Sequence, residues 1–253
     1  MSADIRDRVV VITGASSGIG AATALACAAA GMQVLLAARR DGLLREIASR
    51  IAADGGRAVV CAADLRRTND IERLVGCALD AFGHIEVLVA NAGMGCHEAV
   101  AETSDAEMAA VVEVNLLGVM RCARMVLPHM LRRGRGHIIV VSSVTTGIAW
   151  PNDAIYAATK AGVSRFARGL RNELAPRGIR VTDVVPGVID TPLSREASVL
   201  PRAGATRVAD AIVGAIRRPR NVVVTPSWYR LLLLVNRALP GVVDSVLRRT
   251  SAE

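Results

Sequence analysis

The only lysine of this 253-residue chain, Lys160, lies four residues after Tyr156, although arginine fills every other strongly basic position. A helical pattern over 154–175 places both side chains on one helix face. A phenol has a pKa near ~10, and a neighbouring ammonium lowers that pKa by stabilising the phenolate. The pair therefore suits general acid catalysis, in which the tyrosine protonates the alkoxide formed when a hydride reaches a carbonyl. A core tyrosine beside a solvated lysine is the alternative.

A second hydroxyl, Ser143, precedes the tyrosine by thirteen residues and follows a predicted strand at 137–142. Ligands of open α/β sheets bind beyond the carboxyl ends of the strands. At such a place the serine hydroxyl could donate a hydrogen bond to a carbonyl oxygen as the hydride arrives. An ordinary serine at the end of a strand is the alternative.

A glycine-rich segment, 13-TGASSGIG-20, connects the first predicted strand to an alanine-rich helix. Gly14 permits a tight turn, Gly18 lets the backbone approach a pyrophosphate, and Gly20 lets the helix pack close to the strand. The free N–H groups and the positive dipole end of the helix favour phosphates. The spacing differs from G-x-G-x-x-G, and no lysine follows as in a mononucleotide P-loop. The segment therefore predicts a dinucleotide site, with a plain glycine-rich turn as the alternative.

The residues after the second predicted strand indicate which dinucleotide binds. An NAD site usually has an Asp or Glu there for the ribose 2′-hydroxyl, but this chain has Ala38, Arg39 and Arg40. A guanidinium can bind a 2′-phosphate through two hydrogen bonds. We therefore expect NADP(H) rather than NAD(H), with two solvated arginines as the alternative. A lysine at position 160 also offers a nicotinamide ribose three rotatable donors, which a planar guanidinium does less adaptably.

Strand and helix patterns alternate along the whole chain, which predicts right-handed crossovers and a doubly wound parallel sheet with helices on both faces. Continuous apolar runs predict strands buried on both faces, at 8–13, 33–38, 57–62, 85–90, 137–142, 179–184 and 221–225. Helical periodicity predicts helices near 18–30, 41–53, 68–82, 105–132, 154–175 and 206–217. We expect one domain over 1–226, extended over 227–253 by helices at 228–239 and 241–250 that break at Pro240-Gly241.

The net charge of +8 is uneven, because residues 195–253 contain ten arginines and four acidic residues. A basic tail could meet nucleic acid, an acidic carrier or an anionic membrane surface, and a solvated surface is the alternative. The chain has no interleaved aromatic residues or recognition motif, so we expect no nucleic acid partner.

The cysteine pattern favours a reduced, cytoplasmic protein without a metal site. Five cysteines are scattered, with no C-x-x-C pair and no metal-ligand spacing with the four histidines. The N-terminal MSADIRDR contains no apolar signal core. Charged residues and a proline interrupt 228–247, so this stretch is not expected to span a membrane.

Six motifs in order resemble the short-chain dehydrogenase/reductase family over about residues 7–225: TGASSGIG, 90-ANAG-93, 115-NLLG-118, Ser143, 156-YAATK-160 and 186-PGVIDT-191. The resemblance implies a seven-stranded parallel sheet in the order 3-2-1-4-5-6-7 and a dimer or tetramer. Ala38 with Arg39 is similar to the NADP-preferring branch of the family. Ala90 replaces the first Asn of the usual N-N-A-G, which leaves the turn intact.

The resemblance also implies roles for individual residues. Asn115 would kink its helix and hold a water that relays protons through Lys160, completing a catalytic set with Ser143 and Tyr156. Asp64 would bind the adenine amino group. The cofactor set would further include Ser16, Ser17, Ile19, Leu65, Asn91, Ala92, Gly93, Pro186, Gly187, Ile189 and Thr191.

Residues beside the serine and tyrosine should line the substrate pocket, and these are Thr145, Ile148, Ala149, Trp150 and Pro151, with Met94, Cys96 and the loop 188–205. Their apolar character favours a hydrophobic ketone or secondary alcohol such as a lipid, steroid or terpenoid. Two alternatives are a reductase of 3-oxoacyl thioesters on a carrier or CoA, and a non-catalytic NADP-binding regulator. The tail combines an apolar stripe with arginines, so it could pack on a neighbouring subunit or lie on a membrane surface.

Overall fold

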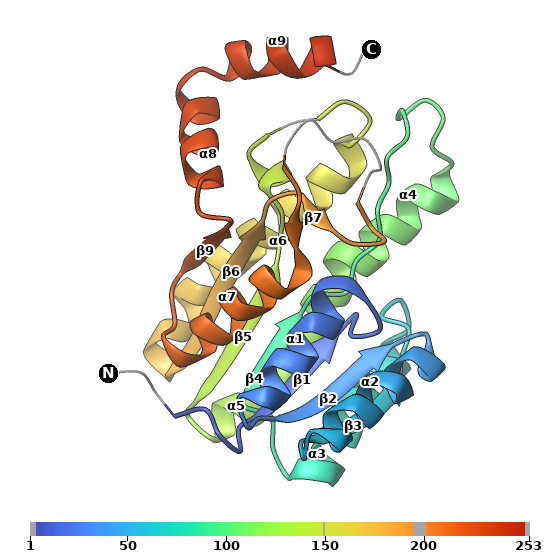
Figure 1. Ribbon diagram of the computed structural model, residues 1–253, viewed down its shortest axis with the longest axis vertical. Coiled ribbons are helices and arrows are strands. Elements are labelled where there is room, and N and C mark those ends of the chain that lie inside the picture. Colours follow the sequence, from blue (N-terminus) through green and yellow to red (C-terminus); the bar gives the residue numbers. More distant parts are fainter. Residues whose placement is uncertain (1–3, 149, 195–200, 251–253) are drawn as a thin grey trace.

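The computed structural model describes residues 4–148, 150–194 and 201–250 of the chain. A seven-stranded parallel sheet has the order β3-β2-β1-β4-β5-β6-β9, and Figure 1 shows it at the centre of the molecule. The predicted fold class and strand order are confirmed, with β9 as the seventh strand. The strands are β1 (Val9–Thr13), β2 (Gln33–Ala38), β3 (Arg57–Ala62), β4 (Val87–Ala90), β5 (Gly136–Val141), β6 (Ile179–Pro186) and β9 (Val222–Thr225).

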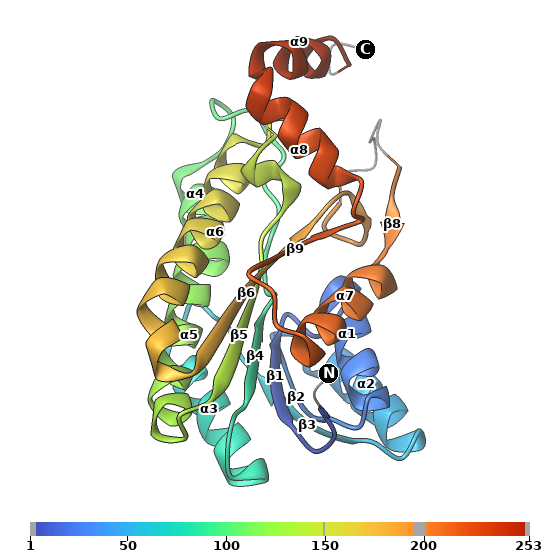
Figure 2. The same cartoon turned by 90° about the vertical axis from the view of Figure 1, so that its left-hand side faces the viewer.

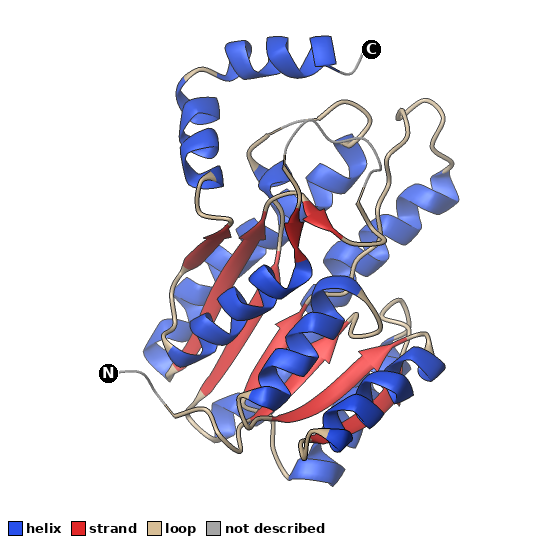
Figure 3. Cartoon of the chain, viewed as in Figure 1, coloured by secondary structure: helices blue, strands red, loops and turns tan. Residues whose placement is uncertain are grey.

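Helices cover both faces of this sheet, which Figure 3 shows as one twisted layer of strands. One face carries α1, α2 and α7, and the other carries α3, α5 and α6 (Figure 2). The bounds are α1 (Gly18–Ala29), α2 (Asp41–Ala53), α3 (Thr68–Phe82), α4 (Asp105–Val112), α5 (Gly118–Arg132), α6 (Ala154–Leu174) and α7 (Ala205–Arg217).

Burial on both faces explains why the strands are continuous apolar runs. All five residues of β1 are buried. Val10 and Ile12 pack under α1, α2 and α7, whereas Val11 packs with α3, α5 and α6. Successive side chains of a strand point to opposite faces, so a sheet between two helical layers needs apolar residues at every position.

The prediction of one continuous helix over 105–132 is wrong in one respect. A π-helical turn at Glu113–Leu117 separates α4 from α5, and the Gly118 N–H donates to the Glu113 carbonyl. Gly118 packs closely on Leu65, because a Cβ at this glycine would lie 3.0 Å from the Leu65 Cβ. A widened turn often marks a functional site, and Asn115 lies within this one.

A second, two-stranded sheet was not predicted from the sequence. It pairs β7 (Ile189–Asp190) with β8 (Ala203–Gly204), and the Ala203 N–H donates to the Val188 carbonyl. Each strand has only two residues, which is too short for a recognisable pattern. This sheet brings the chain after β6 back across the carboxyl end of the main sheet (Figure 1).

The C-terminal extension forms two helices, α8 (Tyr229–Ala238) and α9 (Pro240–Thr250), close to the predicted bounds and broken at Pro240. The Tyr229 ring is fully buried against Gly187, where a Cβ would lie 1.9 Å from the ring. The Tyr229 hydroxyl accepts a hydrogen bond from the Val188 N–H at 3.0 Å. Tyr229 therefore anchors the extension to the segment after β6. Within the described residues, none of the helices has the length and apolarity to cross a membrane.

Replacing Tyr229 should separate its two contributions to stability. Tyr229→Ala removes a fully buried ring and should lower the free energy of unfolding by about 3–5 kcal/mol. Tyr229→Phe keeps the ring but loses the hydrogen bond to Val188, so it should cost only about 1 kcal/mol. Urea denaturation measures both values. Equal losses for the two variants would contradict this account of the anchor.

Candidate active site

Two adjoining cavities lie at the carboxyl end of the sheet, where open α/β sheets bind ligands. The first cavity, of about 200 Å³, lies over the glycine-rich segment. The second cavity, of about 210 Å³, contains Ser143, Tyr156 and Lys160. The residues that line both cavities are Ile19, Asn91, Thr191 and Leu193. The two cavities therefore meet. A ligand in the first cavity could extend its reactive end to a ligand in the second.

The first cavity contains most of the residues that the sequence suggested for a cofactor. They are Gly14, Ser16, Ser17, Gly18, Ile19, Arg39, Arg40, Asp64, Leu65, Asn91, Ala92, Gly93 and Thr191. The second cavity contains the rest except Gly20, namely Tyr156, Lys160, Pro186, Gly187 and Ile189.

The glycines are required by close backbone contacts. Gly14 has a φ of +68°, and a Cβ there would lie 2.7 Å from the Ala92 Cα. A Cβ at Gly20 would lie 2.2 Å from the Gly14 carbonyl oxygen. Ser17 is the N-cap of α1 but makes no side-chain capping bond, so the first N–H groups of the helix remain available to a ligand. This cradle fits a pyrophosphate.

Thr13 connects the glycine-rich segment to the turn after β4, and sequence analysis did not identify this role. Its hydroxyl accepts hydrogen bonds from the main-chain N–H groups of Asn91 and Ala92, each at 3.1 Å. In return, the Asn91 side-chain amide donates to the Thr13 carbonyl at 3.0 Å. These bonds join two strand ends that are far apart in the sequence, and no local motif marks them.

The two arginines after β2 lie in different environments. Arg40 donates to the hydroxyl oxygens of Ser16 at 2.9 Å and Ser17 at 2.7 Å, so it braces the glycine-rich segment. Arg39 lines the same cavity and makes no hydrogen bond with any residue that the structure describes. Its guanidinium is therefore available to an anion bound there.

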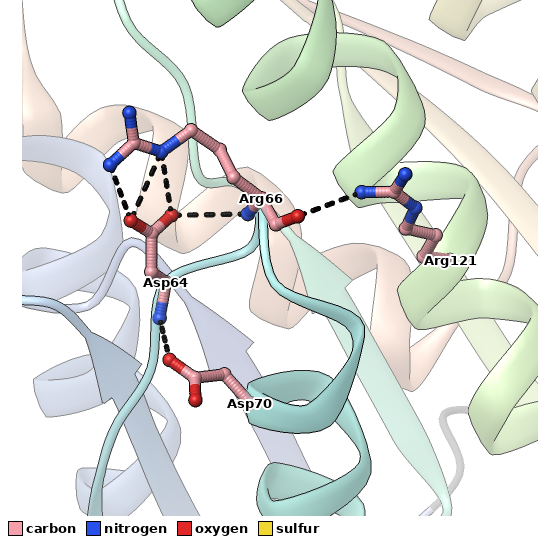
Figure 4. A network of polar contacts seen from close by, with 4 residues as sticks. All are labelled: Asp64, Arg66, Asp70 and Arg121. Atoms are coloured by element: carbon pink, nitrogen blue, oxygen red, sulfur yellow. Dashed lines mark hydrogen bonds and ion pairs between the residues drawn. The ribbon is translucent and has the colours of Figure 1, made fainter.

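Asp64 is oriented by an arginine that sequence analysis missed. Figure 4 shows the Arg66 guanidinium bound to both carboxylate oxygens of Asp64, with an N–O distance of 2.6 Å, and Arg121 bound to the Arg66 carbonyl. The Asp64 N–H donates to the Asp70 carboxylate at 2.9 Å. Hydrogen bonding from Arg66 lowers the pKa of the Asp64 carboxyl, which stays ionised. The carboxylate retains lone pairs for a further donor.

The four suggested catalytic residues come together from three elements. Tyr156 and Lys160 lie on α6, and the lysine Nζ is 5.7 Å from the centre of the tyrosine ring. The Lys160 Nζ donates to the Val141 carbonyl at 2.9 Å, at the end of β5. Ser143 follows this strand, and its hydroxyl accepts from the Thr145 N–H at 3.2 Å.

Asn115 holds the turn after β4 against helix α6. Its side chain is fully buried. Its Oδ1 accepts from the Met94 N–H at 2.8 Å, and its Nδ2 donates to the Met94 carbonyl at 2.9 Å and to the Thr159 hydroxyl at 3.2 Å. A Cβ at Gly93 would lie 3.3 Å from this Oδ1 and 3.5 Å from the Lys160 Nζ. Asn115, Gly93 and Lys160 therefore pack tightly against one another.

The expected lowering of the tyrosine pKa is not found. Burial raises the pKa of Tyr156, the charge of Asp153 raises it further, and a hydrogen bond with Ser143 opposes both effects. Lys160 is not among the groups that lower the pKa of Tyr156. Its Nζ is buried against the Val141 carbonyl, and burial lowers the pKa of Lys160 itself to about 8. The phenol is thus held protonated, the state required of a proton donor.

The wall of the second cavity is less apolar than predicted. Thr145 and Trp150 line it, as expected, but so do His97 and Asp153. Of the other expected wall residues, Met94 lines the first cavity instead, and Ile148, Pro151 and Cys96 line neither cavity. The His97 Nδ1 lies 2.6 Å from an Asp153 carboxylate oxygen, and the imidazole is 6.0 Å from the Tyr156 ring, centre to centre. These residues are 56 positions apart, so no spacing pattern reveals the pair.

Part of the suggested substrate wall lies outside the described residues, namely Ala149 and 195–200 of the loop 188–205. In the part of the chain that is described, no cluster of three or more His, Cys, Asp or Glu residues could bind a metal ion.

Comparison with known proteins places this geometry in a family. The family model described as short chain dehydrogenase matches residues 8–199. The chain is 36% identical over 223 residues to an uncharacterized oxidoreductase of Staphylococcus saprophyticus, covering 87% of this chain and 95% of that protein. It is also 36% identical over 227 residues to 3beta-hydroxysteroid dehydrogenase 1 of Eggerthella lenta, covering 89% of this chain and 87% of that one.

Solved structures show the same architecture. A short chain dehydrogenase/reductase from Burkholderia phymatum in complex with NAD has a TM-score of 0.87 at 26% identity, covering 95% of this chain and 96% of that one. An alcohol dehydrogenase from the archaeon Thermococcus sibiricus complexed with 5-hydroxy-NADP has a TM-score of 0.79 at 30% identity, covering 87% and 95%.

Removing the buried ammonium should stabilise the protein. Because the Lys160 pKa falls from 10.5 to about 8 on folding, the unfolded chain holds more protons between these values, and stability rises with pH across that window. Lys160→Met should therefore raise the free energy of unfolding at pH 7 by up to about 3 kcal/mol. This gain should shrink as the pH rises towards 10.5 and vanish above that value, once the lysine is neutral in both states. Urea denaturation across this pH range measures the difference, and a pH-independent difference would contradict the account.

Proposed function

The chain belongs to the short-chain dehydrogenase family, and we propose that this oxidoreductase interconverts a carbonyl and a secondary alcohol on an apolar substrate with NADP(H). The observation that carries the proposal is the grouping of Ser143, Tyr156 and Lys160 in a cavity that opens into the cradle for a nicotinamide dinucleotide. The alternative, a non-catalytic NADP-binding regulator, would not require Ser143, Tyr156 and Lys160 to lie together next to Asn115.

The proposed mechanism assigns one task to each side chain. A bound nicotinamide would supply or accept the hydride. Tyr156 donates its proton to the alkoxide oxygen in reduction and accepts it back in oxidation. Ser143 donates a hydrogen bond to the same oxygen, where negative charge develops. Lys160 offers its ammonium to the cofactor ribose and to the phenolate that Tyr156 becomes. Asn115 keeps the turn after β4 in register with helix α6.

The preference for NADP(H) rests on charge. Arg39 lines the first cavity at the end of β2 with Arg40 beside it, and neither Ala38 nor the two residues directly after it offer a carboxylate to a ribose 2′-hydroxyl. Arg40 is engaged by the serines of the glycine-rich segment, so Arg39 is the proposed ligand of the 2′-phosphate. The solved relatives do not favour one cofactor, since one is in complex with NAD and another with 5-hydroxy-NADP. Support for NADP(H) over NAD(H) therefore comes from the charge beside Arg39.

The proposed substrate is a hydrophobic ketone or secondary alcohol. Trp150 and Val144 give the second cavity an apolar wall, and the relative from Eggerthella lenta is named as a steroid dehydrogenase. The main alternative is a 3-oxoacyl thioester, which the ten arginines of residues 195–253 favour by attracting an acidic carrier. NADPH oxidation with a panel of apolar ketones, compared with acetoacetyl thioesters, separates the two. Turnover of thioesters alone would replace our proposal.

Tyr156→Phe should abolish turnover while NADPH binding stays unchanged, because the substitution removes the hydroxyl and leaves the ring. A loss of about 1000-fold or more in kcat is expected, since general acid catalysis contributes about 10²–10⁴-fold. Stopped-flow reduction and fluorescence titration of NADPH measure the two quantities. A normal kcat in this variant would refute the mechanism.

Arg39→Ala should weaken NADPH binding by about 10–100-fold and leave the Kd of NADH nearly unchanged, because only NADPH carries the 2′-phosphate. Arg50→Ala, an exposed arginine in the last turn of α2, is the matched control and should change neither Kd. Fluorescence titration with both cofactors provides the comparison. Equal losses for NADPH and NADH would remove Arg39 from the phosphate site.

We further propose that the C-terminal extension packs on a second copy in a dimer or tetramer. Exposed apolar side chains lie on α8, on α9 and at the junction between them, and they include Leu231, Leu234, Leu239 and Val242. Leu231→Glu with Leu234→Glu should shift the protein to a smaller species in light scattering after size exclusion. Binding to anionic vesicles that the double variant loses, with no change in mass, would instead support a membrane contact.

All five cysteines are free thiols, which suits the reducing cytoplasm proposed for this enzyme.

A further inference from the structure

We propose that His97 is a positioning residue for the reaction, because with Asp153 and the Leu193 carbonyl it closes the second cavity around Tyr156. These three groups form what we call the His97 latch. The His97 Nδ1 lies 2.6 Å from the Asp153 Oδ1, and its Nε2 lies 3.1 Å from the Leu193 carbonyl oxygen. The inference rests on the proposed function, since it assigns His97 a part in that reaction.

The latch joins three segments that the fold brings together at the carboxyl end of the sheet. His97 lies in the loop after β4, Asp153 immediately precedes α6, and Leu193 follows β7. Tyr156 lies in the first turn of α6, three residues after Asp153. A side chain that ties both neighbouring segments to the start of this helix therefore restricts where the phenol can move.

Asp153 is committed to His97 rather than to its helix. It occupies the N-cap position of α6, yet its side chain accepts no capping hydrogen bond from that helix. Its side chain is only 8% exposed. A buried carboxylate without a partner is costly, so the short contact with the imidazole is what stabilises it there.

The proton count of the latch follows from its acceptors. A carbonyl oxygen can only accept, so the His97 Nε2 that faces Leu193 carries a proton. The contact of 2.6 Å then requires a second proton between Nδ1 and the Asp153 carboxylate. The pair as a whole therefore carries no net charge, and the negative charge of Asp153 is compensated beside the reacting phenol.

Leu193 lies where the two cavities meet, since it lines both. Its side chain is 38% exposed, so packing alone holds it weakly. Ser194 holds the turn of this segment, because its N–H donates to the Thr191 carbonyl and its hydroxyl donates to the Ile189 carbonyl. The bond from His97 to the Leu193 carbonyl ties this turn to the loop after β4, at the junction between the cofactor and substrate spaces. Losing this bond should widen the junction and weaken substrate binding.

Compensation of Asp153 should matter most as the phenol loses its proton. The charge of Asp153 raises the pKa of Tyr156, so an uncompensated carboxylate would destabilise the phenolate that develops during proton transfer. Losing His97 while keeping Asp153 should therefore slow the chemical step, and neutralising Asp153 in the same protein should restore part of the rate.

Substitutions of His97 separate the two arms of the latch. The amide nitrogen of Asn lies near the position of Nδ1, so His97→Asn should keep a hydrogen bond to Asp153, lose the bond to Leu193, and raise KM. The amide of Gln reaches the position of Nε2, so His97→Gln should keep the bond to Leu193 and leave KM nearly unchanged. A neutral amide supplies no positive charge, so both variants should lower kcat, and His97→Gln should lower it more because Asp153 also loses its hydrogen bond. His97→Ala should raise KM and lower kcat, with kcat reduced about tenfold.

The charge argument is tested by rescue. His97→Ala combined with Asp153→Asn should recover part of the lost kcat but not the raised KM. His129→Ala, which removes a partly buried histidine of α5 that contacts Arg132, is the control and should change neither parameter. Unchanged kinetics in His97→Ala, or a double variant no faster than His97→Ala, would overturn the proposal.

Hydrogen exchange of the cofactor-free protein provides a readout independent of turnover. Amides of 189–194 should exchange faster in His97→Ala and His97→Asn than in the wild type, and His97→Gln should retain protection. Unchanged exchange in His97→Ala would overturn the latch itself. If the wild type reduces no ketone while exchange changes as expected, the proposed function fails and the latch stands as a structural closure.

Discussion

A buried ammonium is the constraint on which the candidate site depends. Lys160 is held in the interior by one hydrogen bond to the Val141 carbonyl, where β5 ends and the segment with Ser143 begins. Burying this charge costs stability, as its lowered pKa reports. The fold tolerates that cost because the same bond fixes helix α6 against the strand end and so places Tyr156 beside Ser143. Burial of Lys160 thus lowers the stability of the folded state, and it also keeps the reactive groups in a fixed arrangement.

The parallel sheet makes this arrangement possible. Strands buried on both faces leave their carboxyl ends as the place where loops with polar side chains can gather. The turn after β4 is tied to the glycine-rich segment by Thr13 and Asn91, and to helix α6 by Asn115. The first tie joins two neighbouring strand ends and the second joins a strand end to helix α6, so the cofactor cradle and the proton donor form one connected polar framework. The anchor of Tyr229 on Gly187 extends this framework to the C-terminal helices.

The pKa of Tyr156 shifts in the direction opposite to the one that the residue types suggest. A tyrosine followed by a lysine suggests a phenol with a lowered pKa, yet burial and Asp153 raise the pKa of Tyr156. Solvation and neighbouring charge compete, and here loss of water outweighs an ammonium 5.7 Å from the ring centre. Tyr156 is therefore held in the protonated state that can donate a proton. In the proposed mechanism, the phenolate that remains is stabilised by Lys160.

Local patterns in the sequence were enough to predict the elements and the chemical inventory. Continuous apolar runs, helical periodicity, the glycines of 13–20 and the set of Ser143, Tyr156 and Lys160 each depend on local pattern. The strand order was expected from the family resemblance that the motifs carry, and not from these patterns alone. Only the tertiary structure decided the π-helical turn at Asn115, the small β7–β8 sheet, the hold of Arg66 on Asp64, and the meeting of His97 with Asp153 and Leu193. These features join residues distant along the chain, or depend on how closely two surfaces approach, and neither property leaves a period or a spacing in the sequence.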